Sequence, residues 1–246
     1  MLEKMSTSAN YYNAAVARHR YQHFITSRKK DNTTELFLEL AEKVIGRGKN
    51  KRALDIGTGN GYVAKCLAEK VSKTNKFYAI DLSPDMIKSA KTYCKNQKNI
   101  VIIQGDNYHL PFDNNSINLV TNKVSTNFSI KEVFRVLKDN GIFVFKEYSK
   151  GKGMTEIANL FPGRIKVKNP FWYLNHINKA GFREYYYHQF FFKNFYTKKE
   201  IQQILAIAPI ISDYKERSDF QKINSFFGER NKIVITSDPF IIVARK

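Results

Sequence analysis

Three glycines at alternate positions follow an acidic residue in the segment Leu54-Asp-Ile-Gly-Thr-Gly-Asn-Gly61. A short apolar run precedes this segment, and a helix-forming run follows it at once. Glycine lets the backbone turn sharply from strand to helix and approach a ligand closely, and the amide groups at the helix start can face a polar ligand. The carboxylate of Asp55 can meet a cation but would repel a pyrophosphate. The loop therefore predicts a nucleoside site with a positively charged group nearby.

Polar side chains also follow three later apolar runs, which lie at residues 77–80, 100–104 and 117–121. They are Asp81, Asp106, Asn107, Asn122 and Lys123. Ligands of open α/β sheets bind at the carboxyl ends of the strands, and a carboxylate beside a ribose can accept two hydroxyl hydrogens. Each of these residues alone is also typical of a turn or a helix cap. Their repetition after successive runs favours a binding site.

Apolar runs and amphipathic runs alternate between residues 35 and 148. We predict strands at 52–56, 77–80, 100–104, 117–121 and 142–148. We predict helices at 35–45, 62–71, 84–95 and 130–137. Alternation at this spacing is typical of a mostly parallel sheet with helices on both faces. Most of the strand runs are nearly continuous in Ile, Val, Leu and Phe, as a sheet covered on both faces requires.

The pattern changes after Tyr148. We predict helices at 171–179 and 198–208, a long aromatic strand at 183–192, and strands at 233–236 and 240–244 on either side of a turn. The chain shows no internal repeat and no clear domain boundary. We therefore predict a single domain over residues 1–246. Its expected parts are an N-terminal lid or cap (1–34), a cofactor-binding core (35–148) and an acceptor-side insertion with the last strands (149–246).

The chain has 246 residues and a formal net charge of +19. The basic excess is spread along the chain, so it fits either a polyanionic partner such as RNA or an A+T-rich coding bias that enriches lysine. We find no apolar stretch long enough for a membrane helix and no signal-peptide pattern at the N-terminus, so we expect a cytoplasmic protein with no membrane partner. Cys66 and Cys94 lack metal-ligand spacing and are expected to be small buried residues, so no metal site is predicted.

Four segments, in this order, resemble motifs of the class I S-adenosylmethionine-dependent methyltransferases, in particular the branch that includes the ubiquinone-biosynthesis type. They are the glycine segment described above, Ala79-Ile-Asp-Leu-Ser-Pro-Asp-Met86, Gly105-Asp-Asn-Tyr-His-Leu-Pro-Phe112 and Val133-Phe-Arg-Val-Leu-Lys-Asp-Asn-Gly-Ile-Phe-Val144. Four motifs together are a specific signal, whereas one alone is weak. The resemblance covers residues 35 to 148 well, the final strands more loosely and the first 30 residues poorly.

The resemblance implies an α/β fold of the Rossmann-like type. Its doubly wound, mostly parallel sheet would have seven strands and helices on both faces. An N-terminal helical segment and a C-terminal helical insertion would form a lid. A dehydrogenase has a similar strand–glycine–helix unit, but its fingerprint needs Gly or Ala where Tyr62 stands, so we rank that alternative low.

The resemblance also implies S-adenosyl-L-methionine as the cofactor. Asp55 would help to hold its ammonium group, Asp81 would accept hydrogen bonds from both ribose hydroxyls, and Leu82 would pack on the adenine. The residues after the third predicted strand would bind the adenine edge, and those after the fourth would line the cavity near the reactive methyl group. The predicted cofactor-binding residues are Asp55, Gly57, Thr58, Gly59, Gly61, Asp81, Leu82, Met86, Gly105, Asp106, Asn107, Asn122 and Lys123.

Catalysis would depend mainly on holding the acceptor in line in a dry pocket, because the sulfonium is already a good leaving group. A general base is needed only where the acceptor must lose a proton. The predicted catalytic residues are His109, which follows the adenine-binding loop, and Tyr148 at the end of the fifth strand. Tyr108 and His176 are further candidates.

The acceptor is predicted to be a small molecule that is anionic or a planar aromatic. Dense aromatic triplets at 171–173, 185–187 and 190–192 favour a planar ligand. A basic run favours an anionic acceptor or RNA if it covers the site, and is otherwise a solvated loop; it comprises Lys146, Lys150, Lys152, Arg164, Lys166 and Lys168. The alternatives are a tRNA, rRNA or nucleotide methyltransferase, and a carboxymethyl transferase whose carboxylated cofactor would meet Lys123 or Lys146. A cofactor-binding protein without activity is a third alternative, although none of the cofactor motifs is degraded. The oligomeric state is left open.

Overall fold

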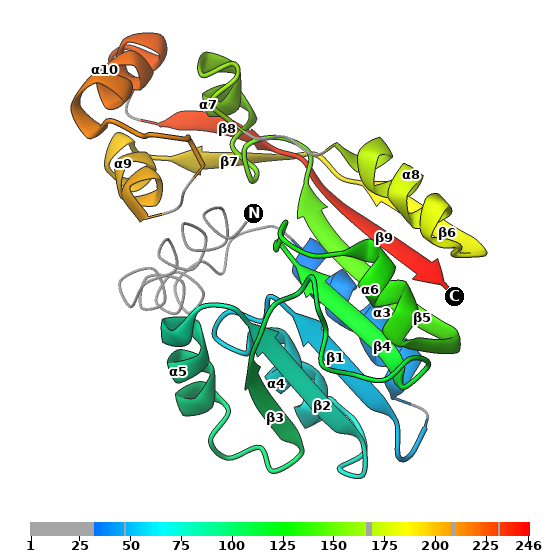
Figure 1. Ribbon diagram of the computed structural model, residues 1–246. Helices are drawn as coiled ribbons and strands as arrows, with labels where there is room; N and C mark the ends of the chain where they lie inside the picture. The colour runs from blue at the N-terminus through cyan, green and yellow to red at the C-terminus, as the bar shows by residue number, and fades with distance from the viewer. Residues whose placement is uncertain (1–31, 47, 166–168, 208–209, 231) are drawn as a thin grey trace.

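Seven strands form one sheet in the order β3-β2-β1-β4-β5-β9-β6 (Figure 1). The computed structural model describes residues 32–46, 48–165, 169–207, 210–230 and 232–246. The strands are β1 (Arg52–Ile56), β2 (Lys76–Asp81), β3 (Ile100–Gln104), β4 (Ile117–Lys123), β5 (Leu137–Tyr148), β6 (Glu184–Gln189) and β9 (Pro239–Arg245). The first five are parallel, β9 is antiparallel to β5, and β6 is antiparallel to β9. The predicted mostly parallel seven-stranded sheet is therefore confirmed.

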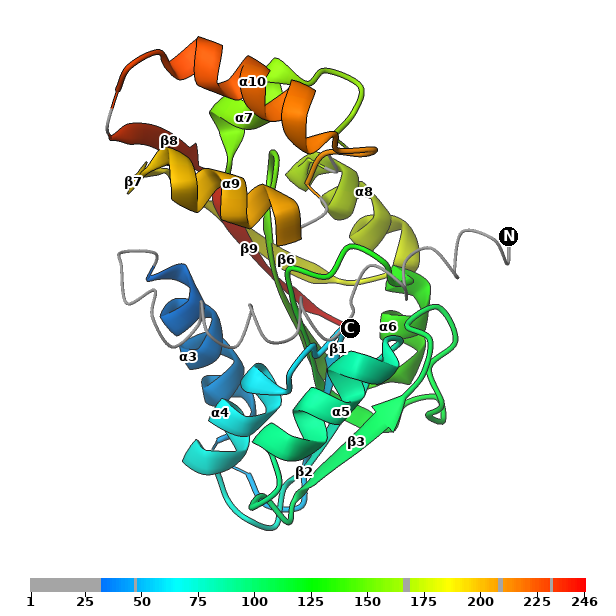
Figure 2. The same cartoon turned by 90° about the vertical axis from the view of Figure 1, so that its left-hand side faces the viewer.

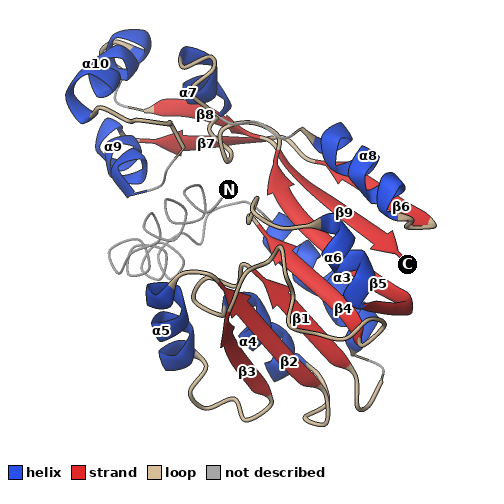
Figure 3. Ribbon diagram, in the orientation of Figure 1, coloured by secondary structure: helices blue, strands red, loops and turns tan. Residues whose placement is uncertain are grey.

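Helices cover both faces of this sheet (Figure 3). They are α3 (Thr33–Ile45), α4 (Tyr62–Lys70), α5 (Pro84–Tyr93), α6 (Ile130–Val136) and α8 (Pro170–Ala180). One apolar core joins α3 and α4 to one face, and a second core joins α6 and α8 to the other. Successive residues of a strand point to opposite faces, so Val144 of β5 belongs to the first core while Phe143 and Phe145 belong to the second. The central strands of the sheet are buried on both faces, as their apolar sequences predict, whereas the edge strands β3 and β6 are more exposed.

Local sequence signals explain where the helices begin and end. The hydroxyl of Ser83 accepts a hydrogen bond from the amide of Met86, and Pro84 occupies the first turn of α5. Asn169 caps α8 in the same way, and α8 ends at Gly181, whose backbone is left-handed. The helices predicted at 84–95 and 171–179 therefore lie within two residues of the observed ones.

A second, smaller unit, which we call the small lobe, has its own core (Figure 2). It contains α7 (Thr155–Leu160), β7 (Phe192–Tyr196), α9 (Lys198–Ile207), α10 (Glu216–Phe227) and β8 (Ile233–Ser237). β7 and β8 form a separate antiparallel sheet of two strands. Because β5 ends just before α7 and β9 begins just after β8, the small lobe lies beyond the carboxyl end of β5.

The long aromatic strand predicted at 183–192 is wrong, because the chain is divided there between two sheets. Residues up to Gln189 pair with β9, whereas Phe192 and its successors pair with β8. The amide of Phe190 donates to the carbonyl of Pro239 at the crossing point, 2.8 Å away. The aromatic pattern runs on without a break, so only the partner strands reveal the division.

Two other boundaries differ from the prediction. The strand predicted at 142–148 begins five residues earlier, because Leu137 already pairs with Ile117 before a register shift in the ladder. The short α7 and the polar α10 were not predicted. The predicted lid segment at 1–34 falls almost wholly outside the described residues, as do Lys166 and Lys168. Every helix in the described ranges is too short or too polar to cross a lipid bilayer.

Candidate active site

The glycine loop between β1 and α4 is shaped by three left-handed backbone positions. Gly57, Gly59 and Gly61 have φ values of 63°, 58° and 83°. A Cβ atom at Gly57 would lie 2.3 Å from the hydroxyl oxygen of Ser125, and one at Gly61 would lie 2.8 Å from the sulfur of Cys94. A Cβ atom at Gly59 would meet no protein atom within 4 Å. Two glycines thus permit close packing, while the middle one borders open space.

Asp81 connects the tips of the first three strands. Its Oδ2 accepts a hydrogen bond from the amide of Gly59 at 2.8 Å, and its Oδ1 accepts one from the amide of Ser83 at 3.0 Å. Its backbone carbonyl accepts from the amide of Gly105 at 3.0 Å. Asp81 is only partly buried, and its carboxylate lies next to the glycine loop.

Asp55 lies beneath the loop and is 4% exposed. Its two carboxylate oxygens accept hydrogen bonds from the hydroxyls of Thr58 at 2.6 Å and Thr121 at 2.8 Å. Burial raises the pKa of Asp55 to about 6, although both hydroxyl contacts and the charge of Lys123 oppose that rise. The side chain therefore orders the loop from below, and its contact with a ligand ammonium group stays a prediction.

We expect Asp55→Asn to stabilise the protein at about pH 8 and much less at about pH 4. The folded state raises this pKa, so it binds the proton more tightly than the unfolded state does. Asp55 therefore adds most stability below its ordinary pKa of 3.8, and this contribution is lost as the pH rises to about 6. The gain in free energy of unfolding should be about 2 kcal/mol larger at the higher pH. Urea denaturation measures it, with Asp85→Asn as control, and a gain that grows toward low pH would contradict the assignment.

The loop after β3 holds a buried amide and an exposed imidazole. Nδ2 of Asn107 donates to the carbonyl of Asn127 at 3.3 Å, while its buried Oδ1 has no hydrogen-bond partner among the described residues. Asp106 accepts from the amide of Tyr108 at 3.0 Å and contacts Nδ1 of His109 at 2.9 Å. The His109 side chain is 83% exposed. That exposure does not suit a base in a dry pocket.

Two further predicted cofactor residues follow β2. Leu82 is partly buried, and Met86, in the first turn of α5, is buried.

The tips of β4 and β5 bring together an amide, two lysines and a tyrosine. Oδ1 of Asn122 accepts from the amide of Ser125 at 3.1 Å. Lys123 lies opposite Lys146 in the parallel ladder. Lys146 is buried, with its Nζ 4.5 Å from the centre of the Tyr148 ring and 3.5 Å from the Tyr148 hydroxyl. Tyr148 is therefore next to a cation at the edge where an acceptor would have to bind.

A family model described as a methyltransferase domain matches residues 47–208, which is more than half of the chain. The chain belongs to this family. The resemblance to class I S-adenosylmethionine-dependent methyltransferases is thereby confirmed. The predicted cofactor, S-adenosyl-L-methionine, is the one that these methyltransferases use.

Named relatives agree with this membership. A demethylmenaquinone methyltransferase of Staphylococcus aureus (strain MRSA252) is 32% identical over 114 residues, which cover 44% of this chain and 47% of the relative. The match thus spans about half the length of this curated relative. A Bacillus halodurans C-125 structure described as a methyltransferase has a TM-score of 0.65 at 19% identity, over 85% of this chain and 98% of that one. Phosphoethanolamine N-methyltransferase 2 of Haemonchus contortus, in complex with S-adenosyl-L-methionine, has a TM-score of 0.58 at 18% identity, over 86% and 52% of the two chains.

Two buried polar residues near this edge, Glu147 and Tyr173, are not among the predicted site residues. A carboxylate inside an apolar strand beside Tyr148 is a signal that could have singled out Glu147. Glu147 is 2% exposed and points to the face of the sheet opposite Lys146. Tyr173 lies on α8, is fully buried and packs with its ring centroid 4.6 Å from that of Phe145. No local pattern could have placed α8 against the tip of β5.

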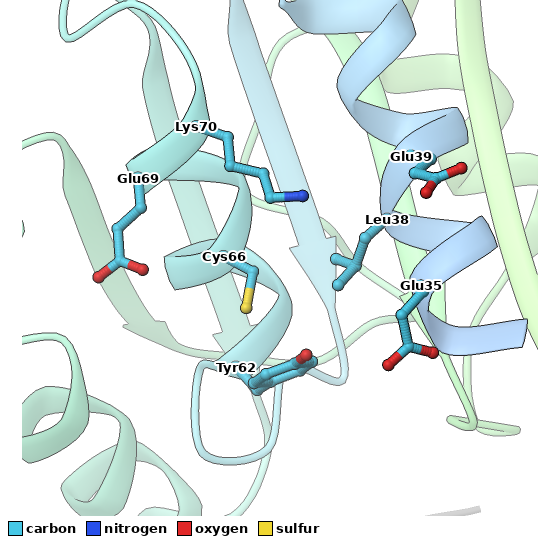
Figure 4. Close-up of a pocket in the computed structure, with 7 residues that line it drawn as sticks. All are labelled: Glu35, Leu38, Glu39, Tyr62, Cys66, Glu69 and Lys70. Carbon is cyan, nitrogen blue, oxygen red and sulfur yellow. The ribbon is translucent and has the colours of Figure 1, made fainter. Parts of the chain in front are cut away.

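A hollow of about 270 Å³ lies between α3 and α4 (Figure 4). Its lining residues are Glu35, Leu38, Glu39, Tyr62, Cys66, Glu69 and Lys70. None of the predicted cofactor-binding residues lines it. Burial raises the pKa of the Cys66 thiol, so this cysteine is not a thiolate at neutral pH. The hollow is separate from the candidate site at the strand tips.

Proposed function

We propose that this methyltransferase binds S-adenosyl-L-methionine over the tips of β1, β2 and β3 and methylates a small molecule held at the tips of β4 and β5. The observation that carries the proposal is the hydrogen bond from the Gly59 amide to Asp81, beside the open space at Gly59. It places a partly exposed carboxylate and a loop with room for a ligand at the carboxyl edge of a parallel sheet, where such folds bind nucleosides.

The residues present suit this cofactor. The carboxylate of Asp81 would accept hydrogen bonds from the ribose hydroxyls. Oδ1 of Asn107, which has no partner in the described part of the chain, would accept one from the adenine amino group. Leu82 and Met86 would supply apolar contact, and Asp55 with the glycine loop would face the methionine part. When bound, the cofactor would supply a methyl group attached to a positively charged sulfur, and this sulfur becomes a neutral thioether when the methyl group is transferred. The protein must then hold the acceptor in line and exclude water.

A small-molecule acceptor is supported by the relatives and by the use of the basic residues. The Staphylococcus relative is named for demethylmenaquinone and the Haemonchus neighbour for phosphoethanolamine, both small molecules. Arg164 makes a two-pronged contact with Asp219 and donates to the carbonyls of Ser212 and Asp213. Lys146 is buried. The basic run is thus partly engaged within the protein, and the relatives do not favour RNA methylation or carboxymethyl transfer.

Calorimetry tests the proposal. We expect one molecule of S-adenosyl-L-methionine or of S-adenosylhomocysteine to bind per chain. Bulk tRNA, titrated at a low and a moderate salt concentration, should show no salt-sensitive affinity, because binding to phosphates weakens steeply with salt. The absence of cofactor binding would overturn the proposal, and a strongly salt-dependent tRNA affinity would replace the acceptor class.

A further inference from the structure

Three buried side chains at the tips of β4, β5 and α8 carry polar atoms that lack hydrogen-bond partners within the described ranges. They are Nδ2 of Asn122, Oε2 of Glu147 and the hydroxyl of Tyr173. The exposed fractions of the three residues are 0%, 2% and 0%. The other oxygens of the first two are engaged, since Oδ1 of Asn122 binds the amide of Ser125 and Oε1 of Glu147 binds the amide of Tyr148 at 2.9 Å.

The three groups lie around one aromatic ring. Asn122 is the partner of Phe145 in the β4–β5 ladder, and Glu147 is two residues further along β5 on the same face. The ring of Tyr173 packs on Phe145 from α8. The Phe240 ring centroid lies 5.8 Å from that of Phe145 and 5.9 Å from that of Tyr173. The three side chains are thus neighbours of one aromatic cluster with Phe145 and Phe240, and their polar atoms have no partner among the described residues.

Such an arrangement costs stability. A buried polar group without a partner costs about 1–3 kcal/mol, and an ionised carboxylate costs more. No contact within the described part of the protein offsets this cost for the three free atoms. A ligand that forms hydrogen bonds with these atoms would offset the cost. Local loss of stability of this kind is typical of functional sites.

The charges around Glu147 indicate what kind of ligand group fits. Burial raises the pKa of Glu147, while the ammonium groups of Lys152, Lys146 and Lys123 oppose that rise. These cations already balance the carboxylate and would repel a cationic amine. Burial and the charge of Glu147 raise the pKa of Tyr173, so its hydroxyl keeps its proton and can donate it. The site therefore suits a neutral group that both donates and accepts a hydrogen bond.

We propose that Asn122, Glu147 and Tyr173 bind the acceptor through a hydroxyl group carried on an aromatic ring, and that Glu147 takes the proton of that hydroxyl. This inference rests on the proposed function and names its acceptor class. Tyr173 and Asn122 donate to one side of the hydroxyl oxygen while Glu147 accepts from it, which leaves the other lone pair of that oxygen for the methyl group. Phe145 and Phe240 contact the ring of the acceptor.

The proton and the electrons balance without a further reactant. The hydroxyl proton passes to Oε2 of Glu147, and an electron pair of the acceptor oxygen forms the new bond to the methyl carbon. The electrons of the broken carbon–sulfur bond stay on sulfur, which becomes neutral. The nearby lysines stabilise the negative charge that develops on the acceptor oxygen.

Binding of three simple probes tests the inference in protein saturated with S-adenosylhomocysteine. Phenol carries the hydroxyl, anisole is its methyl ether without a donor, and benzylamine is a cationic amine. We expect the wild type to bind phenol at least about tenfold more tightly than either other probe. Anisole cannot donate a hydrogen bond to the charged Glu147, and the charges of Lys152, Lys146 and Lys123 repel benzylamine. Glu147→Gln should remove most of the preference for phenol over anisole. Tyr173→Phe should weaken the binding of both, because the oxygen of either probe can accept its hydrogen bond. Ligand-observed NMR titration gives the dissociation constants.

Tyr214→Phe is the matched control, because it removes a buried partnerless hydroxyl from the region of the small lobe. It should leave probe binding unchanged. Glu147→Gln should also keep affinity for S-adenosylhomocysteine and unfold at a temperature no lower than the wild type. Equal binding of phenol and anisole by the wild type, tighter binding of benzylamine, or a marked loss of stability in Glu147→Gln would overturn the inference. If the wild type does not bind S-adenosylhomocysteine, the proposed function itself is wrong.

Discussion

Asp81→Ala is expected to weaken binding of S-adenosyl-L-methionine by about 100-fold. The substitution removes the charged acceptor of two hydrogen bonds that the ribose hydroxyls would donate, which together are worth about 2.7 kcal/mol. It also releases the amide of Gly59, which Asp81 holds at 2.8 Å, so the glycine loop loses its fixed position. Calorimetry with the cofactor measures the loss.

Asp85→Ala is the matched control for this variant. Asp85 lies four residues later, in the first turn of α5, and is not among the predicted cofactor-binding residues. Its removal should change cofactor affinity by less than about threefold, because it alters only the weak field at a helix start. If Asp81→Ala bound the cofactor as tightly as Asp85→Ala, the assignment of the ribose site to the tip of β2 would be wrong.

Gly57→Ala and Gly59→Ala are expected to fail in different ways. The new Cβ at Gly57 would lie 2.3 Å from the Ser125 hydroxyl oxygen and 2.4 Å from the Ser125 Cβ. Together with the left-handed backbone, this clash should lower the free energy of unfolding by about 3 kcal/mol. The new Cβ at Gly59 meets no protein atom, so its cost should be only about 1 kcal/mol. It would, however, occupy the proposed ligand space and lower cofactor affinity at least about tenfold.

Urea denaturation and calorimetry separate the two effects. Adding Ser125→Gly to Gly57→Ala removes the clashing atoms and should recover all but about 1 kcal/mol of the stability. A Gly59→Ala variant that is stable and binds the cofactor normally would show that this open space is not the cofactor site. A Gly57→Ala variant of unchanged stability would contradict the expected clash with Ser125, because the loop and the residues after β4 would then have moved apart at little cost.

The cofactor side of the candidate site could be predicted from the sequence because its residues are local. Asp55 and Asp81 lie at the carboxyl ends of β1 and β2, Asp106 lies two residues after β3, and parallel strands end at one edge of the sheet. The glycine spacing likewise predicts the left-handed turns that the structure contains. The prediction of His109 as a base depends on its position in the chain. Its solvent exposure, which does not suit that role, depends on how the whole loop folds.

The acceptor side could not be predicted in the same way. Lys146 and Glu147 are neighbours in sequence, yet they point to opposite faces of the sheet and have different surroundings. Tyr173 reaches Phe145 only because α8 packs on the same face as α6. The division of the aromatic stretch into β6 and β7 depends on β9 and β8, which lie near the far end of the chain.

The sequence by itself determined the alternation of strands and helices, the glycine turn and the carboxylates at the strand tips. These features depend on backbone preferences and periodicities within a few neighbouring residues. Only the tertiary structure decided which polar atoms are buried without partners, where the small lobe begins and which face of β5 meets the aromatic cluster. Burial and hydrogen bonding depend on residues far apart in the chain, and no local pattern records which of them will meet.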